Sequence, residues 1–132
     1  MKTFIFLFLS VLSIGCKAQS LKYKEVRSSE LNQFAGSIID CQRFELKENF
    51  VKTIITSNPS GSAGNPETGE VSDTIYISNC QSGELLICKL FIVENLINIK
   101  VGSVTENNSS IIVRINHGNY ADRKSSDILI PR

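Results

Sequence analysis

Apolar and polar residues alternate along most of the chain beyond residue 43. The pattern recurs in seven short runs that are rich in Val, Ile, Thr and Phe, and clusters of Asn, Gly, Ser and Asp separate them. Because the side chains of a strand point alternately to the two faces of a sheet, this pattern is typical of strands with one buried face. The expected strands lie in FELK, FVKTIIT, DTIYIS, ELLICKLFIV, NLINIK, SIIVRIN and DILI. The sequence therefore predicts a mainly β protein, a single antiparallel β-sandwich or small barrel of about seven strands.

The clearest pattern is ELLICKLFIVENLINIK, residues 84–100, in which two apolar runs flank Glu94 and Asn95. Asparagine tolerates the positive φ that a two-residue hairpin loop requires. We therefore expect a hairpin with its loop at these two residues, in which Cys88 faces Val101. Its buried face would carry Leu86, Cys88, Leu90, Ile92, Ile97, Ile99 and Val101, and its solvent-facing side Lys89, Asn98 and Lys100.

One segment near the N-terminus has a helical pattern instead. In SSELNQFAGSIID, residues 28–40, apolar residues recur at positions i, i+3, i+4, i+7 and i+8 from Leu31, which is the apolar stripe of a helix. Ser28 or Ser29 is suited to cap its N-terminus. We expect one short helix packed on a sheet, within a single β-rich domain over residues 25–132. The alternative is a strand over residues 34–40.

The first residues, MKTFIFLFLSVLSI, combine one lysine with an apolar run, which is the layout of a signal peptide. The following LSIGCKAQS resembles the cleavage region of bacterial lipoproteins, in which a small residue precedes the cysteine that receives the lipid. The resemblance covers the signal alone. It implies a signal peptide over residues 1–15, a lipid on Cys16 that anchors the protein to a membrane of the bacterial cell envelope, and a tether over residues 16–24. The alternative is ordinary cleavage after Ala18, which would release a secreted chain that begins at Gln19.

The charge balance weighs against one class of partner. The chain has 14 basic and 13 acidic side chains, and loss of the signal would remove Lys2 alone, leaving 14 − 1 = 13 basic against 13 acidic groups. No basic patch with interleaved aromatic residues appears along the sequence. We therefore expect no nucleic-acid partner.

The four cysteines fit an exported protein, because disulfides form and persist outside the cytosol. If Cys16 carries a lipid, the other three permit three single pairings. We expect Cys41–Cys80, because both residues lie at the ends of predicted elements. No two cysteines have the C-x-x-C spacing of a zinc site and the only histidine lies far along the chain, so we expect neither a metal nor a cofactor.

The longest expected loop is SNPSGSAGNPETGEVS, residues 57–72, whose Gly, Pro, Ser and Asn content is typical of a mobile spacer or a binding loop. Its NPETG segment resembles the Asn-Pro-Thr-Thr-Gly loop of the chagasin family, small β-sandwich inhibitors of papain-like cysteine proteases. The resemblance covers five residues and has no counterpart for the family's other two inhibitory loops. It implies a binding loop formed by Asn65, Pro66, Glu67, Thr68 and Gly69. The alternative is a simple β-turn.

No recognisable catalytic signature surrounds the residues that could carry out chemistry. These candidates are His117, Cys41, Cys80, Cys88, Asp40, Asp73, Asp122 and Asp127. We expect a non-enzymatic binding or structural module of the cell envelope that is lipid-anchored and engages a protein or glycan partner. Loops 57–72 and 116–126 are the expected binding loops, since function in β-sandwiches resides in loops on a rigid frame. The alternatives are a chagasin-like inhibitor and a small secreted enzyme without a recognisable catalytic signature.

Overall fold

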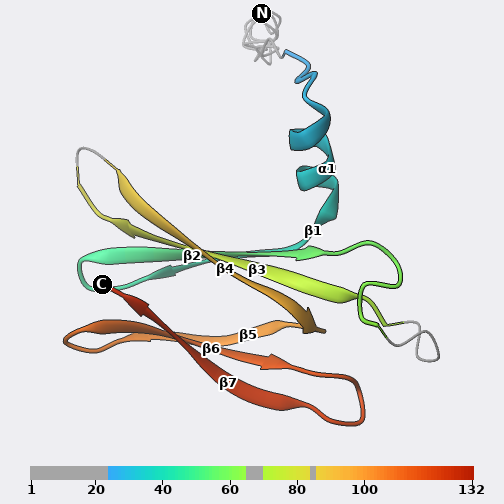
Figure 1. The fold of residues 1–132 in the computed structure, drawn as a ribbon. Coiled ribbons are helices and arrows are strands. Elements are labelled where there is room, and N and C mark those ends of the chain that lie inside the picture. Colours follow the sequence, from blue (N-terminus) through green and yellow to red (C-terminus); the bar gives the residue numbers. More distant parts are fainter. Residues whose placement is uncertain (1–23, 65–69, 84–85) are drawn as a thin grey trace, which may run out of the picture.

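Two antiparallel β-sheets packed face to face make up the computed structural model, which describes residues 24–64, 70–83 and 86–132 (Figure 1). The larger sheet has the strand order β1-β2-β3-β4, and the smaller has the order β5-β6-β7. The elements are α1 (Ser29–Ser37), β1 (Ile38–Glu45), β2 (Asn49–Ser57), β3 (Ser72–Gln81), β4 (Ile87–Ile97), β5 (Lys100–Glu106), β6 (Ser110–His117) and β7 (Lys124–Pro131). This mainly β architecture is compatible with a small β-sandwich, and the predicted fold class is confirmed.

The hydrophobic core lies between the two sheets. Alternate side chains of the central strands point inward, so that Ile55 pairs with Ile75 in the larger sheet and both are at most 1% exposed. The buried cluster consists of Val51, Ile55, Ile75, Ile77, Ile99, Ile111, Val113, Ile115 and Ile130. Each such side chain stabilises the fold by about 1.5–3 kcal/mol through removal of apolar surface from water. The alternation that predicted β2, β3 and β6 is therefore the alternation of this core.

The predicted hairpin loop at Glu94 and Asn95 is wrong. Strand β4 continues through both residues, and the chain crosses to the other sheet later, at Asn98 and Ile99. Opposite these two residues β3 has only Thr74, so the pair forms a β-bulge, and Asn95 has φ of 61°. The positive φ that suggested a turn is thus used by a bulge within one strand.

The buried face of β4 also differs from the predicted one, and the extra residue of the bulge shifts which side chains point inward after it. Before the bulge Phe91 and Val93 pack on the core, whereas Leu90 is 66% and Ile92 49% exposed. After the bulge Leu96 packs on the core. The expectation was wrong for Leu86, Cys88, Leu90 and Ile92, which are exposed, and for Ile97, which is half-buried outside the core cluster. It was right for Ile99 and Val101.

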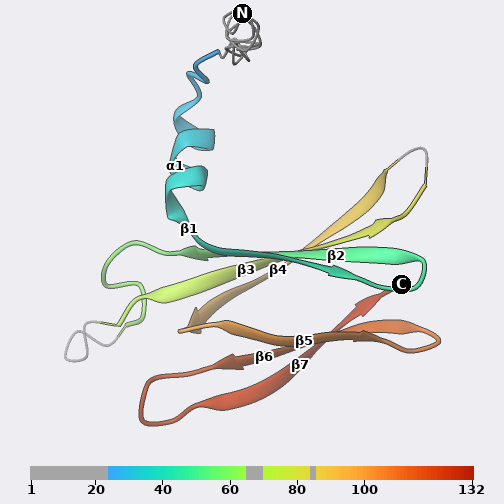
Figure 2. The same ribbon diagram turned by 180° about the vertical axis from the view of Figure 1, so that it is seen from behind.

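The predicted helix is present as α1, but it ends at Ser37, and Ile38 and Ile39 of the predicted apolar stripe begin β1 instead. Ser28 caps it, with its side-chain oxygen accepting a hydrogen bond from the Leu31 amide at 3.3 Å. None of its residues is buried, and its main contact with the sheet is the edge-to-face packing of Phe34 on Tyr76, with ring centroids 5.6 Å apart. Figures 1 and 2 show α1 rising from the start of β1 on the outer side of the larger sheet. Within the described residues, no helix has the length and apolar character needed to cross a membrane.

The predicted disulfide Cys41–Cys80 is wrong, because the structure joins Cys80 to Cys88. These two residues are direct neighbours on β3 and β4, with Cα atoms 4.1 Å apart. Cys41 is an exposed free thiol on β1, and β2 lies between it and β3. Two strand spacings amount to about 9–10 Å, which is beyond the reach of a disulfide.

Candidate functional site

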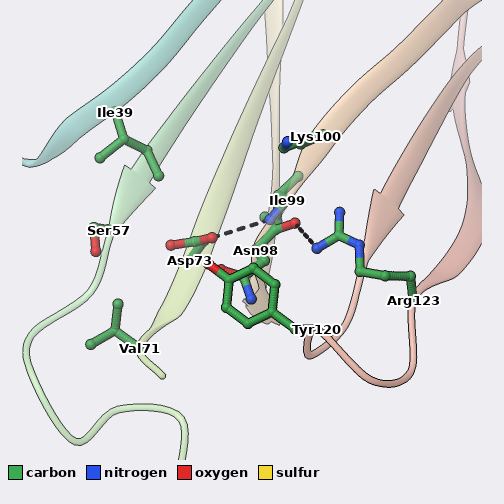
Figure 3. Close-up of a pocket in the computed structure, with 9 residues that line it drawn as sticks. All are labelled: Ile39, Ser57, Val71, Asp73, Asn98, Ile99, Lys100, Tyr120 and Arg123. Carbon is green, nitrogen blue, oxygen red and sulfur yellow. Dashed lines mark hydrogen bonds between the residues drawn. The ribbon is translucent and has the colours of Figure 1, made fainter. Parts of the chain in front are cut away.

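A cavity of about 550 Å³ opens at one end of the sandwich, where β4 passes into β5 (Figure 3). Residues of both sheets and of the loop between β6 and β7 line it: Ile39, Ser57, Val71, Asp73, Asn98, Ile99, Lys100, Tyr120 and Arg123. The two expected binding loops, 57–72 and 116–126, both contribute to this wall. The cavity is therefore the candidate functional site.

The carboxylate of Asp73 is the most buried charged group of the cavity, with the residue only 4% exposed. Its Oδ2 atom accepts a hydrogen bond from the Ile99 amide at 3.2 Å, and Figure 3 shows the other oxygen pointing away, toward the side of Ser57. Burial raises the pKa of this carboxyl group, and hydrogen bonds from the backbone of Ile99 and Asn98 oppose the increase. Asp73 thus holds the crossover between the sheets and offers an acceptor to the cavity.

The guanidinium of Arg123 fixes the opposite wall. Its Nη1 donates to the carbonyl oxygens of Asn98 at 2.8 Å and Gly118 at 3.1 Å, and its Nη2 donates to that of Asn116 at 3.3 Å. The side chain of Asn98 in turn donates to Glu70 Oε1 at 3.2 Å. These bonds tie the loop after β6 to the crossover, so the wall is held by side chains from three separate regions of the sequence.

The rim of the cavity combines a cation with an aromatic ring. Lys100 is exposed at the start of β5, and Tyr120 is 84% exposed on the loop after β6. Ile39 and Val71 add apolar surface on the other side (Figure 3). The cavity therefore has a hydrogen-bond acceptor, Asp73, in its interior, and a donor, Lys100, and an aromatic ring, Tyr120, at its rim. This combination suits a polar ligand that also has an apolar face.

His117 lies outside this cavity. Its Nε2 atom is 2.9 Å from Ser126 Oγ on the neighbouring strand, which is within the distance of a nucleophile and its general base. A catalytic serine also requires a group that orients the histidine and donors for the oxyanion. In the part of the chain that the structure describes, no hydrogen bond reaches the other ring nitrogen. We interpret the pair as a cross-strand hydrogen bond of the exposed sheet surface.

The other candidate aspartates are separated from one another. Asp127 forms a bidentate pair with Arg114 on β6, at 2.7 and 2.8 Å, and the hydrogen bond from that guanidinium lowers the pKa of the carboxyl group. Asp122 pairs with Lys124 at 3.2 Å, and Asp40 accepts a hydrogen bond from the Gln42 side chain at 2.7 Å. Of the aspartates that sequence analysis singled out, only Asp73 belongs to the cavity.

Residues 65–69, which carry the chagasin-like motif, and Cys16 lie outside the described residues. Over residues 24–64, 70–83 and 86–132, no group of three or more His, Cys, Asp or Glu side chains could hold a metal ion.

No family model matches the chain, and no curated protein or solved structure is significantly similar to it.

Sequence analysis missed Asn98, Lys100, Tyr120 and Arg123 as members of the site. Asn98 and Lys100 were assigned to the solvent-facing side of a hairpin that does not exist. Sequence analysis named the loop that contains Tyr120 and Arg123 only as a whole, and the available signal was a lone aromatic residue between Asn119 and Ala121.

Substitutions at Asp73 separate the effect of its charge from that of its hydrogen bonds. Asp73→Asn keeps an oxygen acceptor for the Ile99 amide and removes a charge whose burial is unfavourable, so we expect an unchanged or slightly higher free energy of unfolding at pH 7. Asp73→Ala leaves that buried amide without its partner and should lower the free energy of unfolding by about 1–3 kcal/mol. Urea unfolding monitored by circular dichroism measures both variants.

The raised pKa of Asp73 also fixes the sign of its pH dependence. The native state holds the Asp73 proton more tightly than the unfolded chain does. The stability that this proton contributes is therefore fully present below the unfolded pKa of about 3.9 and is lost as the pH rises through the folded pKa. The stability of the wild type relative to Asp73→Asn should therefore fall as the pH rises above about 3.9. Asp127, whose pKa is lowered, affects the stability of the wild type and of Asp73→Asn equally, so its contribution cancels when the two are compared. A stability difference that rises with pH would contradict the raised pKa of Asp73.

Proposed function

We propose that the protein is an exported, lipid-anchored and non-enzymatic binding module of the cell envelope, and that it binds a glycan in the cavity at the end of the sandwich. Export and anchoring are supported by the apolar N-terminal segment and by the small residue before Cys16. The glycan is supported by the composition of the cavity. The observation that carries it is the combination of the buried acceptor Asp73 with the exposed ring of Tyr120.

The chemistry of a sugar suits this combination. Sugar hydroxyl groups both donate and accept hydrogen bonds, so they can donate to Asp73 and accept from the ammonium group of Lys100. One face of a pyranose ring exposes C–H groups, and a tyrosine ring can cover that face while its hydroxyl group stays in water. The cavity volume of about 550 Å³ lies within the range of small-molecule sites.

The anchor is tested by the intact mass of the protein isolated from the cells that produce it. A chain that begins at Cys16 and carries added acyl mass is the expected result. A bare chain that begins at Gln19 would remove the anchor from the proposal and leave a secreted binding protein. Alkylation before reduction should modify Cys41 and leave Cys80 and Cys88 unmodified, because only the first is a free thiol.

Glycan binding is tested by titrating the protein with soluble oligosaccharides released from the envelope of the producing cell and recording amide NMR shifts. We expect shifts around the cavity and a roughly two- to twelvefold weaker affinity in Tyr120→Ala, since one aromatic contact contributes about 0.5–1.5 kcal/mol. Leu129→Ala is the matched control, because Leu129 is 66% exposed and does not line the cavity. Absence of shifts at millimolar saccharide would overturn the glycan, and turnover of the added saccharide would overturn the non-enzymatic assignment.

A further inference from the structure

Arg123, in the wall of the cavity, differs from every other arginine of the chain in its partners. The others each form an ion pair with a carboxylate, namely Arg27, Arg43, Arg114 and Arg132. Arg123 instead donates three hydrogen bonds to backbone carbonyl oxygens, and among the residues that the structure describes no carboxylate pairs with it. A guanidinium has more N–H donors than these bonds use, so Arg123 retains donors and an uncompensated positive charge.

Lys100 is a second cation on the same wall. It is exposed at the start of β5, and it forms no ion pair within the described part of the chain. Its cross-strand neighbour is Asn116, whose carbonyl oxygen accepts from Nη2 of Arg123 at 3.3 Å, so the sheet brings the two cations to one region. Figure 3 shows both on the side of the cavity opposite Ile39 and Val71.

The carboxylates of this region are held by amide groups and not by the two cations. Asp73 Oδ2 accepts from the Ile99 backbone amide at 3.2 Å, and Glu70 Oε1 accepts from the Asn98 side chain at the same distance. The cavity therefore has a negative charge in its interior, at Asp73, and positive charge at one side of its rim. A ligand anion would be attracted to the rim and repelled from the interior, so this separation also fixes the orientation of an anionic ligand.

We propose that the cavity selects an acidic glycan, whose sugar carboxylate binds Arg123 and Lys100 while neighbouring hydroxyl groups donate to Asp73. The inference rests on the proposed glycan binding and specifies the chemical class of the sugar. The planar fork of an arginine matches a carboxylate, as Arg114 and Asp127 show in this chain with bonds of 2.7 and 2.8 Å. The bonds from Arg123 to the backbone hold its side chain in place before a ligand arrives, so less conformational entropy is lost on binding.

A matched pair of saccharides tests the proposal. The first is an oligosaccharide that contains glucuronate residues, and the second is the same oligosaccharide with its carboxyl groups reduced to primary alcohols. Both offer the same rings to Tyr120, and only the first carries an anion. Titrations followed by amide NMR shifts should give a roughly fivefold higher affinity for the acidic saccharide. This preference should shrink as the salt concentration rises from about 0.02 M to about 0.5 M, because salt screens the exposed cations.

Substitution of Lys100 locates the preference in the cavity. Lys100→Gln removes one cation and leaves the backbone bonds of Arg123 in place, so it should lower the affinity for the acidic saccharide and preserve that for the neutral one. Lys89→Gln is the matched control, because Lys89 is also exposed, lies on β4 and does not line the cavity. It changes the net charge by the same amount and should leave both affinities unchanged.

The possible failures of the acidic glycan and of glycan binding are distinguishable. Equal affinities of the wild type for the two saccharides would overturn the acidic glycan and leave the binding of neutral glycans in place. An equal loss of preference in Lys100→Gln and Lys89→Gln would also overturn it, since the preference would then follow from the net charge of the protein. Binding of neither saccharide, together with no shifts from envelope oligosaccharides, would overturn glycan binding itself.

Discussion

Replacing Gly118 with alanine is expected to lower the free energy of unfolding by about 2–4 kcal/mol. Gly118 follows β6 with φ of 108°, a conformation that L side chains rarely adopt. A Cβ atom here would clash with the carbonyl oxygen of Asp122, which is a backbone atom and cannot rotate away. Relief of the clash requires a shift of the whole loop between β6 and β7.

That loop shift would also loosen the crossover between the sheets. The Gly118 amide donates to the Ile97 carbonyl oxygen at 2.8 Å, and its own carbonyl oxygen accepts from Arg123 at 3.1 Å. We therefore expect Gly118→Ala to weaken glycan binding in the cavity as well as stability.

Gly61→Ala is the matched control for Gly118→Ala. Gly61 also has positive φ, 84°, but no atom lies within 4 Å of the position that a Cβ would occupy. Gly61→Ala should therefore lower the free energy of unfolding only by the cost of placing an L side chain in a left-handed backbone conformation, about 1–2 kcal/mol. Urea unfolding of both variants measures the difference, and equal losses would show that the contact with Asp122 is not the cause.

Strands β2 and β6, which sequence analysis predicted correctly, both have a buried side chain at every second position, from Val51 to Ile55 and from Ile111 to Ile115. In β2 and β6 every second side chain enters the same buried cluster, so the sequence pattern alone reports the buried face. Strand β4 breaks this regularity at Glu94 and Asn95. A residue that tolerates positive φ is compatible with a turn and with a bulge, and only the pairing with β3 distinguishes them.

The cysteine pairing depended on strand order, which the pattern of apolar residues does not report. Sequence analysis placed Cys80 at an element end and Cys88 on a strand, but it did not place their strands side by side. The expected strand began at Glu84, whereas β4 begins at Ile87. Without the β3–β4 hairpin, Cys41 was as good a partner for Cys80 as Cys88.

The candidate site could be located only in part for a similar reason. Loop composition identified 57–72 and 116–126, because Gly, Asn and Ser mark segments outside regular strands. The bonds that Arg123 donates to Asn98 and that the Ile99 amide donates to Asp73 join residues about 25 positions apart in the sequence. Contacts of that kind follow from how the sheets pack, and no local pattern in the sequence specifies them.

Removing the disulfide by Cys80→Ala with Cys88→Ala is expected to lower the free energy of unfolding by about 2–3 kcal/mol, the value for a loop of this short length in the chain-entropy model. The two residues are eight positions apart, and Cys80 is 3% exposed. Cys41→Ala is the control, because that thiol is exposed and unpaired, and it should change stability by less than about 0.5 kcal/mol. Urea unfolding with and without a reductant measures all three proteins.

The reductant provides the internal test of this prediction. It should lower the stability of the wild type and of Cys41→Ala by the same amount, and it should leave the double variant unchanged. A reductant effect that Cys41→Ala abolishes would instead mean that Cys41 is oxidised in the protein. Because the disulfide holds the start of β4 and the cavity lies at its other end, the pH dependence of the Asp73 contribution should persist in the double variant. If the double variant lost this pH dependence along with the disulfide, β4 would have to transmit the constraint of the disulfide along its whole length to the cavity.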